Sequence, residues 1–135
     1  MKRFIGIVAA LGLFVSSCSS GNTEGYKNMS VASADSLIKA DTNVLVLDVR
    51  TPDEYSSETG HLKNAKLLPV DELEGRIGEL NAYKSKTVVT YCRSGSRSAK
   101  AADILTKKGF KVVNVEGGIS SWNESGLPAE KGTAQ

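Results

Sequence analysis

A loop with one cysteine, two arginines and a glycine follows a short β-branched run at 87–91. The loop residues are Cys92, Arg93, Ser94, Gly95, Ser96 and Arg97. Glycine and small serines let the backbone curl, so that several amide hydrogens point inward and form an anion-binding concavity. Such surroundings, with nearby guanidinium groups, lower a cysteine pKa from about 8.5 to between roughly 3.5 and 7.5. We therefore predict that Cys92 is a nucleophile at neutral pH.

The simpler alternative is a buried cysteine at a strand end, beside a solvated turn, because cysteine is commonly buried. That interpretation leaves the nearby arginines, glycine and helix start unexplained.

A second polar segment, Asp48-Val49-Arg50, follows another apolar run. We expect Asp48 and Arg50 to brace the same edge through hydrogen bonds and an ion pair. His61, the only histidine, is either a general base for Cys92 or part of a turn, and we favour the turn.

The elements that must position these residues alternate along the chain. Short apolar runs without polar alternation are typical of parallel strands buried on both faces, and they lie at 44–47, 87–91 and 112–115. Helical patterns lie between them, at 33–40, from Thr51-Pro52 onward, at 71–80 and at 98–108. We expect Ser33 and Ser98 to cap the first and last of these helices. The alternation predicts an α/β domain, in which ligands bind at the carboxyl ends of the strands.

Four ordered segments resemble those of single-domain rhodaneses, a family of sulfurtransferases. They are Asp48-Val49-Arg50 with Glu54-Tyr55, Gly60-His61-Leu62 with Ala65 and Pro69, Cys92 to Ser98, and Gly117-Gly118 with Trp122 and Gly126-Leu127-Pro128. The pattern departs from the family at Asn64 and Lys66, where proline and glycine are common, which affects a surface turn. The resemblance implies a three-layer α/β domain with a central five-stranded parallel sheet flanked by helices.

The same resemblance implies a ping-pong reaction. Cys92 would take the outer sulfur of a donor such as thiosulfate, become a persulfide, and pass the sulfur to cyanide or a thiol. The backbone amides of 93–97 would hold the persulfide charge, and Arg93 and Arg97 would attract an anionic donor. The resemblance implies no metal and no organic cofactor. The chain has one histidine and two cysteines, of which we expect Cys18 to be lipidated, and these residues do not make a zinc site of the usual kind.

Other functions share parts of this pattern. Cysteine-dependent phosphatases place one more residue between cysteine and arginine than the four found between Cys92 and Arg97. The shorter loop suits a single sulfur atom better than a phosphate group. Thiol redox chemistry lacks a nearby resolving cysteine. A module that carries sulfane sulfur or polysulfide, or that docks a partner without turnover, is the alternative that the sequence leaves open.

The first segment resembles a bacterial lipoprotein signal peptide. Lys2 and Arg3 precede the apolar stretch Phe4–Val15, which is shorter than the about 20 residues that a membrane span needs. Val15-Ser16-Ser17-Cys18 resembles the lipobox, whose cysteine is lipidated and becomes the first residue after cleavage. The simpler alternative is an ordinary signal peptide with a chance cysteine. We expect a signal peptide at 1–17, a lipid-anchored flexible tether at 18–25, a rhodanese-like domain at 26–129 and a flexible tail at 130–135.

Lipidation of Cys18 would hold the protein on the periplasmic or cell-surface side of a bacterial membrane and leave Cys92 as the only free thiol.

The chain has 17 Lys plus Arg and 15 Asp plus Glu, a net charge of +2. Lys2 and Arg3 account for that excess, so the rest is formally neutral, which argues against nucleic-acid binding. The expected partners are a small anionic sulfur donor, thiosulfate or polysulfide, and a small or protein thiol acceptor. We expect a monomer.

Overall fold

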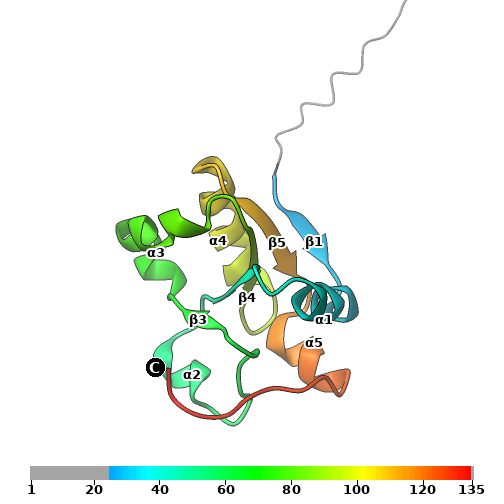
Figure 1. The fold of residues 1–135 in the computed structure, drawn as a ribbon. Helices are drawn as coiled ribbons and strands as arrows, with labels where there is room; N and C mark the ends of the chain where they lie inside the picture. The colour runs from blue at the N-terminus through cyan, green and yellow to red at the C-terminus, as the bar shows by residue number, and fades with distance from the viewer. Residues whose placement is uncertain (1–24, 135) are drawn as a thin grey trace, which may run out of the picture.

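The computed structural model describes residues 25–134 (Figure 1). The predicted signal peptide, Cys18 and all but the last residue of the expected tether lie outside the described residues. Within the described part, no helix is long and apolar enough to cross a membrane.

The centre of the domain is a five-stranded sheet in which every pair of neighbours is parallel. In chain order the strands are β1 Lys27–Met29, β2 Leu45–Asp48, β3 Lys66–Leu67, β4 Thr87–Tyr91 and β5 Lys111–Val115. Their spatial order is β1-β5-β4-β2-β3, which puts β4 in the middle of the sheet. The predicted fold class is confirmed. The three predicted strands are present, and β1 and β3 complete the sheet at its two edges.

Residues 25–134 form five α-helices and one 3-10 helix, which lie between the strands and, for the last helix, after them. They are α1 Val31–Ala40, α2 Pro52–Tyr55, α3 Val70–Arg76, η1 Ile77–Tyr83, α4 Ser96–Lys107 and α5 Gly118–Glu124. Ser33 was the wrong choice of cap for α1, because the Ser30 hydroxyl accepts the Ser33 amide and the helix begins earlier. The helix predicted over 71–80 ends its α-helical part at Arg76 and continues as η1. Gly75 and Gly78 lie at this change, and glycine weakens regular α-helix.

Helices cover both faces of the sheet, which therefore has two hydrophobic cores. On one face, Leu45 and Leu47 of β2 pack with the buried side of α3 and α4. On the other face, Val46 of β2 packs with residues of α1, α2 and α5, including Trp122. Figure 1 shows α3 and α4 on one side of the strands and α1 and α5 on the other. This burial on both faces explains why the strands lack polar alternation.

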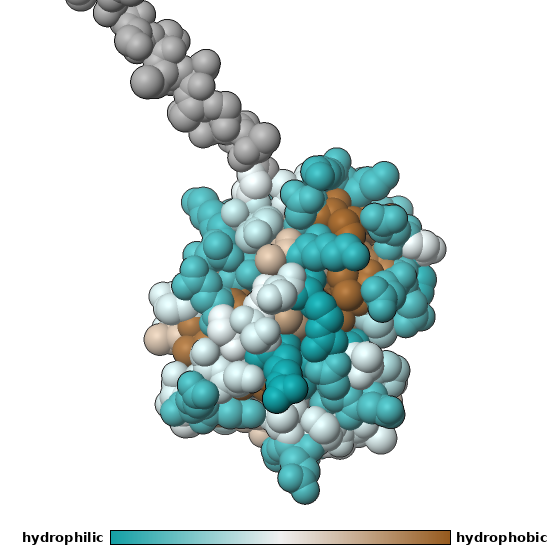
Figure 2. All heavy atoms as spheres, turned by 180° about the vertical axis from the view of Figure 1, so that it is seen from behind, coloured by the Kyte–Doolittle hydropathy of each residue, from teal (hydrophilic) through white to brown (hydrophobic). Residues whose placement is uncertain are grey.

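A surface hollow of about 850 Å³ lies at the amino ends of β1 and β5, and Tyr26, Phe110, Lys27, Lys84 and Lys111 line it. Figure 2 shows the molecule from behind, where hydrophobic side chains gather in a patch bordered by hydrophilic ones. Because all strands are parallel, Cys92 lies at the opposite end of the sheet, directly after β4. The hollow is therefore separate from the edge that carries the predicted chemistry.

Candidate active site

Cys92 lies where β4 ends and the chain turns into α4. The residue is buried, with 1% of its surface exposed. Gly95 precedes the first residue of α4 and has φ 107°, a left-handed conformation that favours glycine. The turn therefore brings the amino end of a 12-residue helix up to the thiol, as the sequence predicts.

Amide and hydroxyl hydrogens surround the Cys92 sulfur. The Gly95 amide donates to Sγ at 3.1 Å, and the Ser98 hydroxyl lies 3.4 Å from it. Burial acts to raise the pKa of the Cys92 thiol, but hydrogen bonds from the Ser98 hydroxyl and from the amides of Ser98, Gly95 and Ser94 outweigh it. The pKa of Cys92 is therefore lowered from its ordinary value, and the thiolate is favoured.

Ser98 has a different place from the one predicted. Helix α4 begins at Ser96, two positions earlier, so Ser98 lies inside the first turn and does not cap the helix. Its buried hydroxyl has one hydrogen, which it donates either to Cys92 Sγ or to the Gly95 carbonyl at 3.1 Å. The Gly95 amide donates to the sulfur, and the expectation that the amides of 93–97 hold a persulfide charge stays a prediction.

Helix α5 holds the other side of the Cys92 loop. The amides of Ile119 and Ser120 donate to the carbonyls of Cys92 and Arg93, at 2.9 and 3.1 Å. A Cβ atom at Gly118 would lie 2.3 Å from the Cys92 carbonyl oxygen, so only glycine allows this close approach. The two carbonyls are thus turned toward α5, which leaves the amides of the loop free to face the sulfur.

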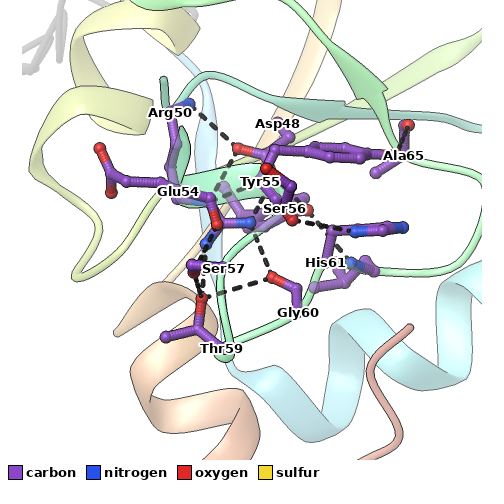
Figure 3. Close-up of polar contacts among 12 residues, drawn as sticks. Asp48, Arg50, Glu54, Tyr55, Ser56, Ser57, Thr59, Gly60, His61 and Ala65 are labelled. Carbon is purple, nitrogen blue, oxygen red and sulfur yellow. Dashed lines mark hydrogen bonds and ion pairs between the residues drawn. The ribbon is translucent and has the colours of Figure 1, made fainter. Parts of the chain in front are cut away.

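A buried polar network lies beside the loop, at the carboxyl end of β2. The Arg50 guanidinium donates to Asp48 Oδ2 at 2.6 Å and to the Gly60 carbonyl at 2.9 Å. The Tyr91 hydroxyl, at the end of β4, donates to Asp48 Oδ2 at 2.6 Å and accepts the Leu62 amide. Figure 3 shows Asp48 and Arg50 facing one another above the segment from Ser57 to Gly60. The predicted ion pair between Asp48 and Arg50 is present.

Arg97 and Arg93 differ in their surroundings. The Arg97 guanidinium donates to both carboxylate oxygens of Glu54 in α2, at 2.7 and 2.8 Å. Hydrogen bonds from Arg97 lower the pKa of Glu54 to about 2, against burial, which acts to raise it. Arg93 is exposed, and within residues 25–134 it forms no ion pair. Arg97 is therefore already paired with a carboxylate, whereas Arg93 is not paired within the described residues, and the expectation that both arginines attract an anionic donor stays a prediction.

The family comparison agrees with this geometry. The model of the rhodanese-like domain family matches residues 30–125, which include the Cys92 loop, Asp48, Arg50 and Gly118. The chain belongs to this family.

Two relatives of this rhodanese-like domain are named as sulfurtransferases. A sulfurtransferase of Allochromatium vinosum is 42% identical over 66% of this chain and 81% of that protein. The putative sulfurtransferase YtwF of Bacillus subtilis is 33% identical over 76% of this chain and 95% of its own length. The crystal structure of a rhodanese-related protein from Thermoplasma volcanium has a TM-score of 0.68 at 37% identity, and the match covers 76% of this chain and 96% of that one.

His61 and Trp122 have structural surroundings in the rhodanese-like domain. The buried His61 ring stacks on Tyr55, with centroids 3.9 Å apart, and its Nδ1 lies 3.1 Å from the Tyr55 carbonyl. None of its hydrogen bonds among the described residues reaches Cys92. Its backbone pairs with Glu130, the first residue of the expected tail. The buried Trp122 donates to the Pro128 carbonyl. His61 therefore stabilises the packing of its loop against Tyr55 and Glu130, and Trp122 stabilises the turn that contains Pro128.

Several contributors to the site were absent from the sequence prediction. They are the Ser98 hydroxyl, the amides of Ile119 and Ser120, the Tyr91 hydroxyl and the Glu54 carboxylate. One signal for Glu54 was available, because Arg97 lies in the first turn of a helix, where a positive charge opposes the helix dipole and needs an acidic partner. Within residues 25–134, no three His, Cys, Asp or Glu side chains come together as a metal site.

Proposed function

We propose that this protein is a sulfurtransferase that moves sulfane sulfur through a persulfide on Cys92. The observation that carries the proposal is the set of hydrogen-bond donors around Sγ, with the Gly95 amide at 3.1 Å and the Ser98 hydroxyl at 3.4 Å. These donors are fixed by the turn and by α4 before any substrate binds. They therefore stabilise negative charge on sulfur without reorganisation.

The reaction has two balanced steps. The Cys92 thiolate bonds to the outer sulfur of thiosulfate, the bond between the two thiosulfate sulfurs breaks, and sulfite leaves with the electron pair. Cyanide then bonds to the outer sulfur of the Cys92 persulfide, and thiocyanate leaves while the thiolate is restored. The amides of Ser94, Gly95 and Ser98 face negative charge on sulfur in both steps, so the same hydrogen-bond donors act in both. A thiol can replace cyanide as the acceptor.

A phosphatase function has less support. The Arg97 guanidinium would have to clamp a phosphate group, but both of its terminal nitrogens donate to Glu54. The loop between Cys92 and Arg97 is also one residue shorter than a phosphatase loop. Both observations favour transfer of a single sulfur atom.

The test is to incubate the full chain with thiosulfate and cyanide, to measure thiocyanate, and to map added sulfur by peptide mass spectrometry. We expect sulfur on the Cys92 peptide and thiocyanate in solution, with both lost in Cys92→Ser. Ser98→Ala should keep the reaction but raise the pKa of Cys92 and slow the reaction at neutral pH, because one donor to the sulfur is removed. Sulfur on Cys92 without thiocyanate would favour a carrier without turnover. No added sulfur with thiosulfate or polysulfide would refute the proposal.

We also propose that Cys18 carries the lipid that anchors the domain to a bacterial membrane on its periplasmic or outer side. Support comes from the sequence Val15-Ser16-Ser17-Cys18 after an apolar stretch. Several acyl chains on one cysteine would anchor stably, since each buried methylene contributes roughly 0.8 kcal/mol. Growth with a labelled fatty acid should label the wild-type protein and not Cys18→Ser. Equal labelling of both would contradict the anchor.

A further inference from the structure

The ion pair between Arg97 and Glu54 joins the two loops at the carboxyl ends of β2 and β4. Glu54 lies in α2, which follows β2, and Arg97 lies in the first turn of α4, which follows the Cys92 loop. Both carboxylate oxygens accept from the guanidinium, and Thr51 also donates to Glu54 Oε1 at 3.3 Å. The side chains are 36% and 32% exposed, so the pair lies at the surface of the site rather than in the core.

This ion pair sets how much positive charge faces a sulfur donor. With its pKa at about 2, Glu54 is a carboxylate throughout the physiological range and compensates the charge of Arg97. Arg97 still lies close enough to Cys92 for the two charges to interact. Figure 3 shows the Glu54 side chain pointing away from the network of Asp48 and Arg50. Arg93 is then the one arginine of the loop without an ion pair among residues 25–134.

A sulfur donor with two negative charges gains little attraction at this site. The Glu54 carboxylate cancels the charge of Arg97. The Cys92 thiolate is negative, so only Arg93 and the hydrogen-bond donors of the loop remain to attract an anion. A donor with one charge or none meets less repulsion, since the interaction energy scales with the product of the charges. Resting on the proposed sulfur transfer, we propose that Glu54 is a specificity residue that favours organic sulfane-sulfur donors of low charge over dianionic thiosulfate.

The chemistry of such donors matches the first step of the proposed reaction. With an organic thiosulfonate, the Cys92 thiolate bonds to the outer sulfur, the bond to the inner sulfur breaks, and a sulfinate leaves with the electron pair. With an organic hydropersulfide, the leaving group is the thiolate of the parent thiol. Neither step needs an added oxidant or reductant.

The test compares two donors that differ by one charge, thiosulfate and methanethiosulfonate, with cyanide as the acceptor. In the full chain, Glu54→Gln should raise kcat/KM for thiosulfate relative to methanethiosulfonate by about three- to tenfold at low salt. The gain should shrink at high salt, where charges at the surface are screened. Arg97→Gln should move the ratio in the opposite direction, because it leaves the Glu54 carboxylate uncompensated. The control is Glu79→Gln, which breaks an exposed ion pair with Arg76 and should leave the ratio unchanged.

A purely structural role for the pair predicts another result. Loss of structure would slow both donors alike in both variants, and an unmoved ratio would overturn the proposal. If the wild type transfers no sulfur at all, the proposed function fails while the charge argument stays testable. Iodoacetate and iodoacetamide differ by one negative charge and alkylate a thiolate. Glu54→Gln should then raise the iodoacetate-to-iodoacetamide rate ratio at Cys92, and an unchanged ratio would again overturn the proposal.

Discussion

Two arginine–carboxylate pairs lie near the same edge of the sheet, and they differ in depth. Arg50 and Asp48 are 1% and 0% exposed, whereas Arg97 and Glu54 are 36% and 32% exposed. A buried charge that loses its partner is costly, while a surface pair is screened by water and salt. The comparison indicates that the deep pair maintains the shape of the site and that the shallow pair sets its charge.

The deep pair is also the better connected one. Arg50 binds Thr59 and the Gly60 carbonyl besides Asp48, and Tyr91 joins the carboxylate to the end of β4. This network ties together the segments that follow β2 and β4, and Cys92 comes directly after Tyr91. Removal of Arg50 or its partners should therefore lower the free energy of unfolding. Removal of Arg97 or Glu54 should mainly change how the site discriminates between substrates of different charge.

The largest expected effect is that of Arg50→Met. Asp48 would stay buried without its cation, so the free energy of unfolding should fall by about 3–5 kcal/mol. Denaturant unfolding measures this loss, and Arg76→Met is a matched control because it removes an arginine from exposed ion pairs. Similar losses of stability in Arg50→Met and Arg76→Met would contradict the difference drawn between the buried pair and the surface pair.

A smaller loss is expected for Tyr91→Phe, which keeps the ring in the core. The change removes the donor to Asp48 and the acceptor of the Leu62 amide, and both groups are buried. Unsatisfied buried groups cost about 1–3 kcal/mol, and the same unfolding experiment measures the loss. Wild-type stability in this variant would show that the hydroxyl contributes nothing to the deep network.

Glu54→Gln should have the smallest effect on stability, below about 1 kcal/mol at neutral pH. The folded-state pKa of Glu54 is about 2 and its ordinary value is 4.5. A lowered pKa means that the stabilisation is complete above about pH 4.5 and is lost as the pH falls toward 2. Unfolding between pH 7 and 2 should therefore show a steeper acid loss in the wild type than in this variant. Glu124→Gln is the control, and equal slopes for the wild type and Glu54→Gln would contradict the assignment.

Local sequence signals predicted the central elements but not the edges of the sheet. Thr51-Pro52 begins α2 as expected, since a capping hydroxyl and a proline at the first position both act within one turn. Strands β1 and β3 have three and two residues, too few to show a periodicity. Their pairing with β5 and β2 is a tertiary effect. The family resemblance, and not composition, supplied the count of five strands.

The site shows the same division between local and distant causes. The loop composition predicted that Cys92 meets a helix amino end, because glycine and serine act locally. The start of α4 was placed too late, since Gly95 takes a left-handed conformation that brings Ser96 into the helix. The partner of Arg97 lies far away in the sequence, so the position of Arg97 in its helix indicates an acidic partner but not that this partner is Glu54. The roles of the loop residues in catalysis stay predictions until sulfur transfer is measured.

The most direct test of the account is the rate of persulfide formation on Cys92 across pH, followed by mass spectrometry of the Cys92 peptide after addition of a sulfane-sulfur donor. Sulfur should appear on this peptide, and the rate should be half-maximal at a pH below about 8.5, the ordinary pKa of a cysteine thiol. The midpoint should be higher in Ser98→Ala. No sulfur on Cys92 at any pH, or a wild-type midpoint at or above about 8.5, would contradict the proposed activation of this thiol.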